Sequence, residues 1–333
     1  MKLSRFDASV TDQWDAFVAR SLNGTLMQTR RFLSYHAPDK FLDHSILCYD
    51  SSNQLAAVFP AAEVVQQGQR IWQSHPGASH GGPIIAVDLS TTRIDELLAD
   101  LVSYASDAGF HAIRWRAPEK VFWARIGDEL DTALIRAGCV LEGCELSAVF
   151  RVSPSPNGDF DSLRQFEPNA RNSVHKARRE GVTARATDDF PGFWQLLSAN
   201  LMDRHQARPT HSLDEIERLR AILGDKVELW GGYHGERLVS GVVMFRLTET
   251  AAHIMYIAQD YQWQHLRSLN LVLCEMLQAC GERGLAAVNF GISTIPGSLG
   301  RVLNHGLHAF KRSCGGEGIA RDMWYKSLTR SCE

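Results

Sequence analysis

The sequence predicts an α/β protein made of two similar halves, and three observations support this fold class. Apolar residues recur along the chain alternately with the period of helices and the period of strands. A helix, a glycine and a strand follow one another at 94–118 and again at 268–293, each time after a run of predicted strands. Between them, the segment 153–159 (SPSPNGD) has the composition of a linker. We therefore predict two domains, residues 1–152 and residues 153–333.

The two helix–glycine–strand segments align in a single register. The aligned pairs are Leu98 with Leu273, Leu101 with Met276, Gly109 with Gly284, Ile113 with Val288, and Trp115 with Phe290. A shared register of this kind indicates an internal duplication. The alternative is a coincidence between two ordinary helix–strand segments.

Composition and charge limit the classes of function. The chain has 333 residues, of which 44% are hydrophobic and 22% charged, and its formal net charge is −3. This is the balance of a globular protein with a sizeable core and no general attraction to nucleic acid or anionic lipid. The longest apolar stretch, 55–65, is broken by Pro60 and Glu63, and the first residues lack the apolar segment of a secretory signal. We expect no membrane span and a cytoplasmic protein.

In the first half, each predicted element has its own pattern. Residues 11–20 begin with a Thr/Asp start signal and place Trp14, Phe17 and Val18 on one helical face. The other predicted elements are strands at 44–50, 55–65, 70–76 and 111–118, a Gly-rich loop at 77–83, and an amphipathic helix at 94–110 that ends at Gly109.

The second half begins with a short basic helix at 168–181, in which Pro168 suits the first helical position and Gly181 the C-terminal cap. Its Arg and Lys side chains suit phosphate binding, and a solvated charged face is the open alternative. The elements predicted after it are strands at 227–233, 238–247 and 251–258, a helix at 268–285, and strands at 286–293 and 322–328.

The segment Asp203–Leu219 (DRHQARPTHSLDEIERL) is a candidate functional region. Ser212 and Glu215 have the spacing of a capping box at the start of a helix. The residues before that helix include Arg204, His205 and His211, which we place in a loop. Histidine can accept a proton near neutral pH, although a purely structural role for both histidines is equally open.

A third candidate region is Asn289–Gly316, which follows a predicted strand and contains six glycines. Long Gly-rich connections in compact domains are usually functional or disordered. Lys311, placed at the end of such a loop, could neutralise a phosphate or a developing oxyanion. The alternative is an ordinary surface lysine.

Other common chemistries lack their residues. The chain has no GxGxxG after a strand, no GxxxxGK[ST], no HExxH and no GxSxG. Its seven cysteines include no CxxC pair and no zinc-finger spacing. We expect reduced, packed thiols and no metal site, with Cys314 the cysteine nearest to a candidate site.

An ordered set of motifs resembles the FemAB-like, double-GNAT acyltransferases. The motifs are WDAFVARSLNGTLMQT, GASHGGPII, NARNSVHKARREGV, RPTHSLDEIERL, AHIMYIAQD, and NFGIST followed by LNHGLHAFKRSCGG. They extend over nearly the whole chain, and their order is more specific than any one of them. The closest branch is the bacterial group whose second half is a GNAT acetyltransferase-type domain.

The resemblance implies tandem GNAT-like (acyl-CoA N-acyltransferase-type) domains, each a mixed β-sheet flanked by helices, that move an acyl group onto an amine. Fem-type members take an aminoacyl group from transfer RNA to a peptidoglycan precursor, and others are thought to use acyl-coenzyme A on sugar or cell-envelope intermediates. The acceptor is thus a small molecule or a glycan or peptide precursor. The Phe310–Lys311 pair matches the FK pair of Fem-type proteins.

The donor side departs from the family pattern. Coenzyme A-binding GNAT enzymes carry a Gly-rich pyrophosphate loop before the long helix, whereas here the segment 260–270 (DYQWQHLRSLN) has no glycine. Trp263 and His265 add bulk there, and Arg267 is a candidate phosphate contact. The helical-hairpin arm of tRNA-dependent Fem proteins is also absent. Acyl-coenzyme A and aminoacyl-tRNA both stay open as donors, and so does a non-catalytic partner in envelope biosynthesis.

We assign the candidate site residues on this basis. The assigned roles are His211 as a base, Tyr256 as a proton donor, Lys311 as an oxyanion stabiliser, Asn304 as a positioning amide, Arg267 as a donor contact, and Arg204, His205, His75, Ser79, Gly81 and Gly82 as substrate-binding residues. Acyl transfer to an amine needs the acceptor held in line, a proton acceptor and donors for the oxyanion.

Overall fold

The computed structural model describes residues 1–152 and 160–328, without the side chains of residues 204 and 205. The predicted linker at 153–159 therefore lies outside the described residues. The chain folds into two compact units. Unit 1 comprises Met1–Glu145, Pro296–Val302 and Ala320–Glu333, and unit 2 comprises Leu146–Ile295 and Leu303–Ile319.

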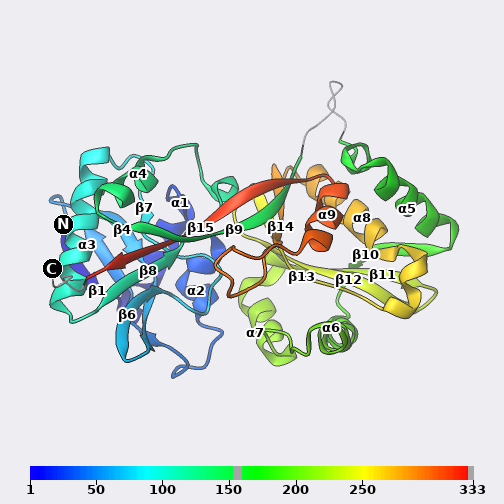
Figure 1. The fold of residues 1–333 in the computed structure, drawn as a ribbon, viewed down its shortest axis with the longest axis horizontal. Helices are drawn as coiled ribbons and strands as arrows, with labels where there is room; N and C mark the ends of the chain where they lie inside the picture. The colour runs from blue at the N-terminus through cyan, green and yellow to red at the C-terminus, as the bar shows by residue number, and fades with distance from the viewer. Residues whose placement is uncertain (153–159, 329–333) are drawn as a thin grey trace. The chain divides into compact units, whose positions relative to one another are not determined.

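Unit 2 is a mixed sheet with helices on both faces (Figure 1). In chain order its elements are α5 (Pro168–Arg179), β10 (Val182–Thr187), α6 (Phe190–His205), α7 (Leu213–Leu223), β11 (Val227–His234), β12 (Arg237–Arg246), β13 (Ala251–Gln259), α8 (Ser268–Glu282), β14 (Ala287–Ile292) and α9 (His305–Ser313). The strand order is β10-β11-β12-β13-β14-β9, where β9 is Val140–Arg151. All these pairs are antiparallel except β13 with β14.

The two faces of the sheet in unit 2 have different helices. Figure 1 shows α5 and α8 on one face and α6 and α7 on the other. The core under α5 and α8 includes Val174, Val242, Ile254, Met276 and Phe290. Because side chains alternate along a strand, the residues next to Ile254 in β13 face α6 and α7 instead. This second face carries His211 and Tyr256, which contact Trp194 of α6.

Unit 1 repeats the same succession of elements. In chain order they are β1 (Lys2–Arg5), α1 (Thr11–Arg20), α2 (Arg30–Leu33), β2 (Leu42–Asp43), β3 (Ile46–Tyr49), β4 (Leu55–Phe59), β5 (Ala61–Gln66), β6 (Gln69–Ser74), β7 (Ile84–Ile85), α3 (Thr91–Asp107), β8 (Ala112–Arg116) and α4 (Glu129–Arg136). The predicted strand at 55–65 is corrected, because Pro60 lacks an N–H and divides it into β4 and β5. β4 pairs with β3 and β7, whereas β5 pairs with β2 and β6.

The helix–glycine–strand repeat is present in both units. α3 is followed by Gly109 at φ +75° and α8 by Gly284 at φ +81°, a backbone conformation that suits glycine after a helix. The strand after each glycine pairs parallel with an earlier strand: β14 with β13, which directly precedes α8, and β8 with β6, which β7 separates from α3. The duplicated α/β organisation predicted from the sequence is therefore confirmed at the level of strand topology.

Two long strands run from one unit into the other. β9 leaves unit 1 after Glu145, and its last residues pair with β14 in unit 2. β15 (Gly316–Ser327) leaves unit 2 after Ile319, and its last residues pair with β8 in unit 1. Each half of the sequence thus supplies a strand to the sheet of the other unit. A domain boundary at 152, at the end of β9, stays a prediction.

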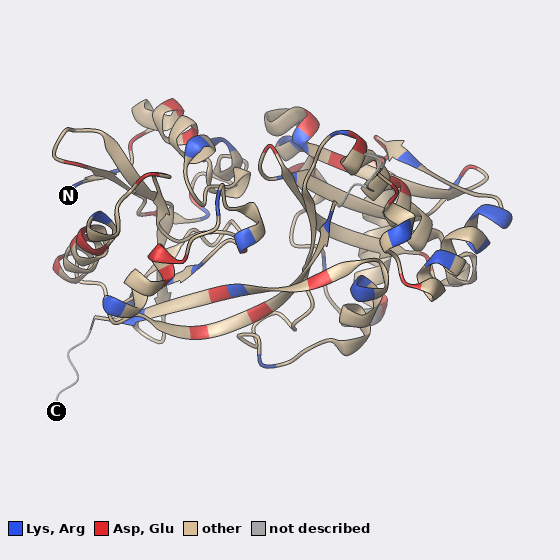
Figure 2. Ribbon diagram, turned by 90° about the horizontal axis from the view of Figure 1, so that it is seen from above, with Lys and Arg blue, Asp and Glu red and all other residues tan. Residues whose placement is uncertain are grey.

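Figure 2 shows Lys and Arg interspersed with Asp and Glu along both units. An exception is α5, which has four Lys and Arg residues and no Asp or Glu within Pro168–Arg179. Within the described residues, no helix is long and apolar enough to span a bilayer.

Candidate functional site

The clearest polar pair in unit 2 joins His211 to Tyr256. His211 immediately precedes α7, whose first turn is fixed by the reciprocal hydrogen bonds of Ser212 and Glu215. Its imidazole Nδ1 lies 2.5 Å from the Tyr256 hydroxyl of β13, and its backbone N–H donates to the same oxygen at 3.2 Å. The His211 carbonyl accepts the indole N–H of Trp194 in α6. The structure therefore brings together two residues that are 45 positions apart in the sequence.

The environment of Tyr256 keeps its hydroxyl protonated. Burial raises the pKa of Tyr256 to about 12. The hydrogen bonds with His211 and Thr210 lower the pKa, but their effect is smaller than that of burial. Because the phenol oxygen accepts the His211 backbone N–H, its own proton is available for Nδ1 of His211. A neutral imidazole with its proton on Nε2 fits this arrangement. The pair is therefore set up to pass a proton from Tyr256 to His211.

β13 and β14 stop pairing close to this pair. Their parallel ladder extends over three residues of each strand and ends with His253 opposite Asn289, while both strands continue. A register shift in the β12–β13 ladder adds an extra residue, Met255, just before Tyr256. Such a bulge bends a strand and redirects its side chains. The sequence analysis missed His253 and Asn289, which are both buried, although both lie in motifs that support the family resemblance.

Lys311 lies in α9 and is 3% exposed, so the prediction of a lysine at the end of a loop is wrong. Its ammonium donates to the carbonyl oxygens of Gly291 at 2.8 Å and Ile292 at 2.6 Å. These are the last two residues of β14, next to the point where it separates from β13. Lys311 thus fixes the end of a strand that borders the candidate site. Its predicted role as an oxyanion stabiliser is not tested by this geometry.

Asn304 has a structural contact that the sequence analysis did not foresee. It is the N-terminal cap of α9, and its side-chain oxygen accepts the backbone N–H of Leu307 at 3.0 Å. Its own N–H donates to the carbonyl of Ser293, directly after β14. Asn304 therefore orients the helix that carries Lys311. A further role as a positioning amide for substrate stays a prediction.

The predicted donor junction, 260–270, forms a short 3-10 helix over Tyr261–Leu266 before α8 begins at Ser268. Trp263 lies between two imidazoles, with ring centroids 5.2 Å from His234 and 6.2 Å from His265. Arg267 is exposed and adopts φ +59° at the start of α8. The first amides of a helix have no intrahelical acceptor and suit a phosphate. At this junction Arg267 is exposed, whereas Ser268, Leu269 and Asn270 at the start of α8 are buried and the N–H of Asn270 donates to the carbonyl of Arg267.

The Gly-rich loop of unit 1 is mostly buried, which leaves little surface for an acceptor. His75, Gly81 and Gly82 are buried, and Ser79 is half-buried. His75 accepts the N–H of Gly77 on its Nδ1, and burial lowers the pKa of His75 to about 4. Gly81 donates its N–H to the carbonyl of Arg116 at 2.7 Å. The predicted substrate-binding role of these four residues is untested, and the structure gives His75 and Gly81 packing contacts.

Two other predicted residues fall at the end of α6. Arg204 and His205 belong to this helix, which extends to His205, and their side chains lie outside the described part of the structure. Their predicted position in a loop before α7 is therefore wrong for the backbone. Gln206, the next residue, ends the helix in the left-handed conformation.

Cys314 is fully buried and hydrogen-bonds to Asn270, and burial raises the pKa of its thiol to about 12. Since a thiolate is the reactive form of cysteine, Cys314 is a packing residue. The six described cysteines are free, and five of them are buried, whereas Cys144 is exposed, so the prediction of packed thiols is wrong for Cys144.

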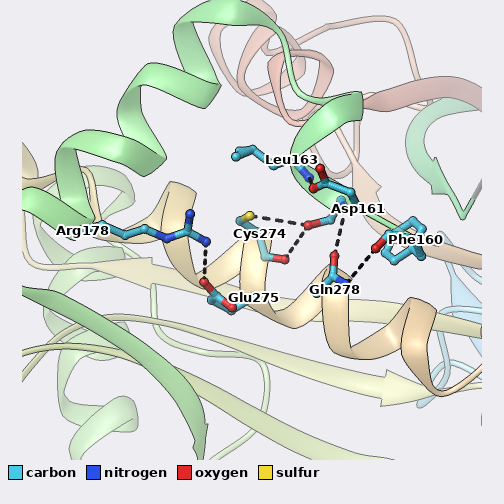
Figure 3. Close-up of a pocket in the computed structure, with 8 residues that line it drawn as sticks. Phe160, Asp161, Leu163, Arg178, Cys274, Glu275 and Gln278 are labelled. Atoms are coloured by element: carbon cyan, nitrogen blue, oxygen red, sulfur yellow. Dashed lines mark hydrogen bonds and ion pairs between the residues drawn. The ribbon is translucent and has the colours of Figure 1, made fainter. Parts of the chain in front are cut away.

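A hollow of about 320 Å³ in unit 2 lies away from these residues, between α5, α8 and the segment 160–163 (Figure 3). Its polar groups bond to one another. Arg178 pairs with Glu275 at 2.8 Å, Ser162 donates its hydroxyl to the carbonyl of Cys274 at 2.9 Å, and Gln278 donates to the carbonyl of Phe160 at 2.9 Å. We interpret the hollow as a hydrogen-bonded seam between helices.

Comparisons with known proteins agree with the observed fold. A family model described as an acetyltransferase (GNAT) domain matches residues 164–312, which contain His211, Tyr256 and Lys311. Residues 164–312 are thus similar to GNAT acetyltransferase domains, and this similarity supports an acyltransferase. No curated protein sequence matches the chain.

Solved structures are similar to the chain over both halves of the sequence. The crystal structure of FemX has 14% identity and a TM-score of 0.73, covering 98% of this chain and 97% of its own. A tandem GNAT protein from the clavulanic acid biosynthesis pathway has 10% identity and a TM-score of 0.54, covering 99% of both chains. L-PGS from Bacillus licheniformis has 12% identity and a TM-score of 0.55, covering 86% of this chain and 84% of its own. The fold is therefore the predicted tandem GNAT fold.

Proposed function

We propose that the chain is an N-acyltransferase that moves an acyl group to an amine of a cell-envelope or sugar intermediate. The observation that carries this proposal is the contact between His211 Nδ1 and the Tyr256 hydroxyl within the GNAT domain. An amine that attacks an ester or thioester must lose a proton, and the leaving group must gain one. A hydrogen-bonded His–Tyr pair can do both.

The proton path follows from the hydrogen bonds. As the amine forms its bond to the acyl carbon, its proton passes to the Tyr256 oxygen, and the phenolic proton passes to Nδ1 of His211. The protonated imidazole then returns its proton through Tyr256 to the leaving group. Because burial raises the pKa of Tyr256 to about 12, the residue starts the cycle protonated. His211 thus acts as the base, and Tyr256 is the donor that contacts the substrate.

We assign Lys311 a positioning role in this reaction. Its ammonium is bonded to the carbonyls of Gly291 and Ile292, so it holds the end of β14 at the point where that strand separates from β13. A strand fixed in this way keeps one border of the site rigid, and rigid borders keep the reacting groups in line. A direct contact with the developing oxyanion, as the sequence analysis predicted, is the alternative role of Lys311.

Acyl-coenzyme A and aminoacyl-tRNA are the two donors that the fold supports. The exposed Arg267 at the start of α8 favours a phosphate-bearing donor. The stacked Trp263 and His265 take up space that a pyrophosphate would need beside Arg267. This bulk favours aminoacyl-tRNA as a second candidate donor. We therefore expect acetyl-coenzyme A to bind with a Kd no tighter than roughly 100 μM.

The catalytic proposal is tested by turnover of two variants. Thiol release from acetyl-coenzyme A would be followed with a panel of amino sugars and amino-bearing peptides, and aminoacyl transfer from charged tRNA in parallel. His211→Gln and Tyr256→Phe should each lower turnover by about 10²- to 10⁴-fold. Tyr233→Phe is the matched control, because its phenol lies on β11 and bonds to Thr187 instead. Near-normal turnover of Tyr256→Phe would overturn the proton path.

The donor is tested separately by isothermal titration. Arg267→Ala should weaken binding of acetyl-coenzyme A by about 1.5–3 kcal/mol if the pyrophosphate lies at the start of α8. Low-micromolar binding by the unmodified chain would show that the junction accepts coenzyme A well and would remove the argument for tRNA. Binding of neither donor would support the alternative of a non-catalytic partner in envelope biosynthesis.

A further inference from the structure

Unit 1 contains a second polar cluster, built around Glu145 of β9. Arg321 of β15 donates to Glu145 Oε2 through both Nε at 3.0 Å and Nη2 at 2.6 Å. Arg116 of β8 approaches the same oxygen, with its Nε 3.7 Å away. The side chains of Arg321 and Glu145 are 7% and 4% exposed, whereas that of Arg116 is 42% exposed. Two guanidinium groups therefore share one carboxylate oxygen, and one of them is accessible.

A neighbouring arginine on β8, Arg114, has a carboxylate partner of its own, unlike Arg116. Arg114 of β8 forms a two-pronged pair with Glu142 of β9, with both N···O distances 2.8 Å. This one-to-one pair satisfies both partners in the planar geometry that arginine and carboxylate prefer. Arg116 lacks such a partner, because Arg321 already occupies Glu145. Among the described residues, the buried Nε of Arg116 has no hydrogen-bond acceptor.

The other carboxylate that faces Arg116 is Glu119, which also contacts His80. Glu119 acts on Arg116 electrostatically, but its Oε2 lies 3.0 Å from Nε2 of His80, and both side chains are fully buried. Burial and the nearby Arg321 lower the pKa of Arg116, against Glu145 and Glu119, which raise it. The two carboxylates Glu145 and Glu119 thus face the two arginines, and the guanidinium group of Arg116 is the most exposed of these four charged groups. An added anion would relieve the repulsion between the two arginines.

We infer that Arg116, with Arg321 behind it, forms a binding site for a phosphate group of a ligand. Phosphate fits because its several oxygens can accept from more than one guanidinium nitrogen at once. The site involves residues of unit 1, whereas the proposed acyl-transfer residues lie in unit 2. The inference therefore goes beyond the proposed function, and its failure would leave that function standing.

Titration of the full chain with inorganic phosphate at low ionic strength tests the site. Arg116→Gln should weaken phosphate binding by about tenfold or more, which is about 1.4 kcal/mol. Arg114→Gln, the matched control on the same strand, should leave it unchanged. Acetate, as a second probe, should bind more weakly than phosphate, because one carboxylate accepts fewer hydrogen bonds.

Two further variants keep the test decisive. Glu145→Gln should tighten phosphate binding, since it removes the negative charge that competes for the guanidinium groups, and this gain cannot come from misfolding. Arg116→Lys keeps the positive charge and serves in place of Arg116→Gln if that variant does not fold. The inference is overturned if the unmodified chain binds no phosphate, if Arg114→Gln and Arg116→Gln weaken binding equally, or if Glu145→Gln weakens it.

Discussion

Unit 1 and unit 2 differ at the connection that follows β6 in unit 1 and β13 in unit 2. In unit 2 the chain passes from β13 through the segment 260–267 into α8, and β13 and β14 separate after three paired residues. In unit 1 the chain leaves β6 through the buried loop 75–83 before it reaches β7 and α3. This loop bonds to the end of β8, because Gly81 donates to the carbonyl of Arg116. Ser74, the last residue of β6, accepts the N–H of Arg116.

The two units therefore differ in what contacts the end of the strand that follows the helix, which is β8 in unit 1 and β14 in unit 2. In unit 1 the end of the strand after the helix is closed by the chain's own loop. In unit 2 the matching strand ends in two carbonyls that Lys311 holds, next to the buried His253 and Asn289. The proposed proton path through His211 and Tyr256 lies in unit 2, whereas His75 and Gly81 in the loop of unit 1 have packing contacts.

The largest expected effect is that of Lys311→Met. Removal of the ammonium leaves two backbone carbonyls without their donor, so the free energy of unfolding should fall by about 4 kcal/mol. Turnover should fall by about 10²-fold or more, because β14 loses its fixed end. Chemical denaturation and the thiol-release assay measure the two effects.

Arg312→Met is the control for Lys311→Met, since Arg312 is the next residue of α9 and is exposed. It should change neither stability nor turnover appreciably. If Lys311→Met were also to leave the free energy of unfolding unchanged, the hydrogen bonds from Lys311 to the two carbonyls would not contribute to stability.

The second prediction concerns the closed loop of unit 1. A Cβ at Gly81 would lie 2.2 Å from Cβ of Ser74, an atom fixed to the backbone of β6. Gly81→Ala should therefore lower the free energy of unfolding by about 3 kcal/mol, as overpacking does. Gly306→Ala in α9 is the control, because its nearest neighbour, Asn304 Oδ1, is 3.7 Å away. Equal stabilities of the two variants, measured by urea unfolding, would contradict the tight packing of this loop.

The third prediction is acid destabilisation of unit 1. Burial lowers the pKa of His75 to about 4, whereas an unfolded histidine titrates near 6.5. Between these values the unfolded state binds more protons, so the free energy of unfolding should fall as the pH falls, by about 3 kcal/mol at most. Urea unfolding at several pH values, compared with His75→Gln, measures this loss. The variant should lose less stability in acid, and an identical pH dependence would rule out His75 as its source.

Much of the fold could be predicted because its signals are local. The helix–glycine–strand repeat and the capping box at Ser212 both depend on residues close in sequence. Pro60 could also be recognised in the sequence. The division of 55–65 into two strands of different sheets could not be predicted, because it depends on which strands pair with β4 and β5. The strands that change unit could not be predicted, since nothing within β9 or β15 indicates a partner in the other half.

The site was predicted in part, for a related reason. His211 and Tyr256 were selected separately, and only the fold places Nδ1 of one within reach of the hydroxyl of the other. Lys311 was placed in a loop because the glycines around it hide the helical pattern of α9. His253 and Asn289 were missed because a single polar residue in an apolar strand looks like a tolerated exception until its register partner is known.

The last prediction is the smallest and concerns the alkaline limit of unit 2. Burial raises the pKa of Tyr256 to about 12, whereas an unfolded tyrosine titrates near 10. Between these values the unfolded state has already lost its proton, so the free energy of unfolding falls as the pH rises, by about 2 kcal/mol from this residue. Tyr256→Phe removes the titrating group, so the stability difference between the unmodified chain and this variant should shrink by that amount between pH values of about 9.5 and 12. Tyr233→Phe provides the comparison for a phenol bonded to Thr187. A difference that stays constant over this range would mean that Tyr256 ionises as readily as an exposed tyrosine, and the proton path through it would lose its physical basis.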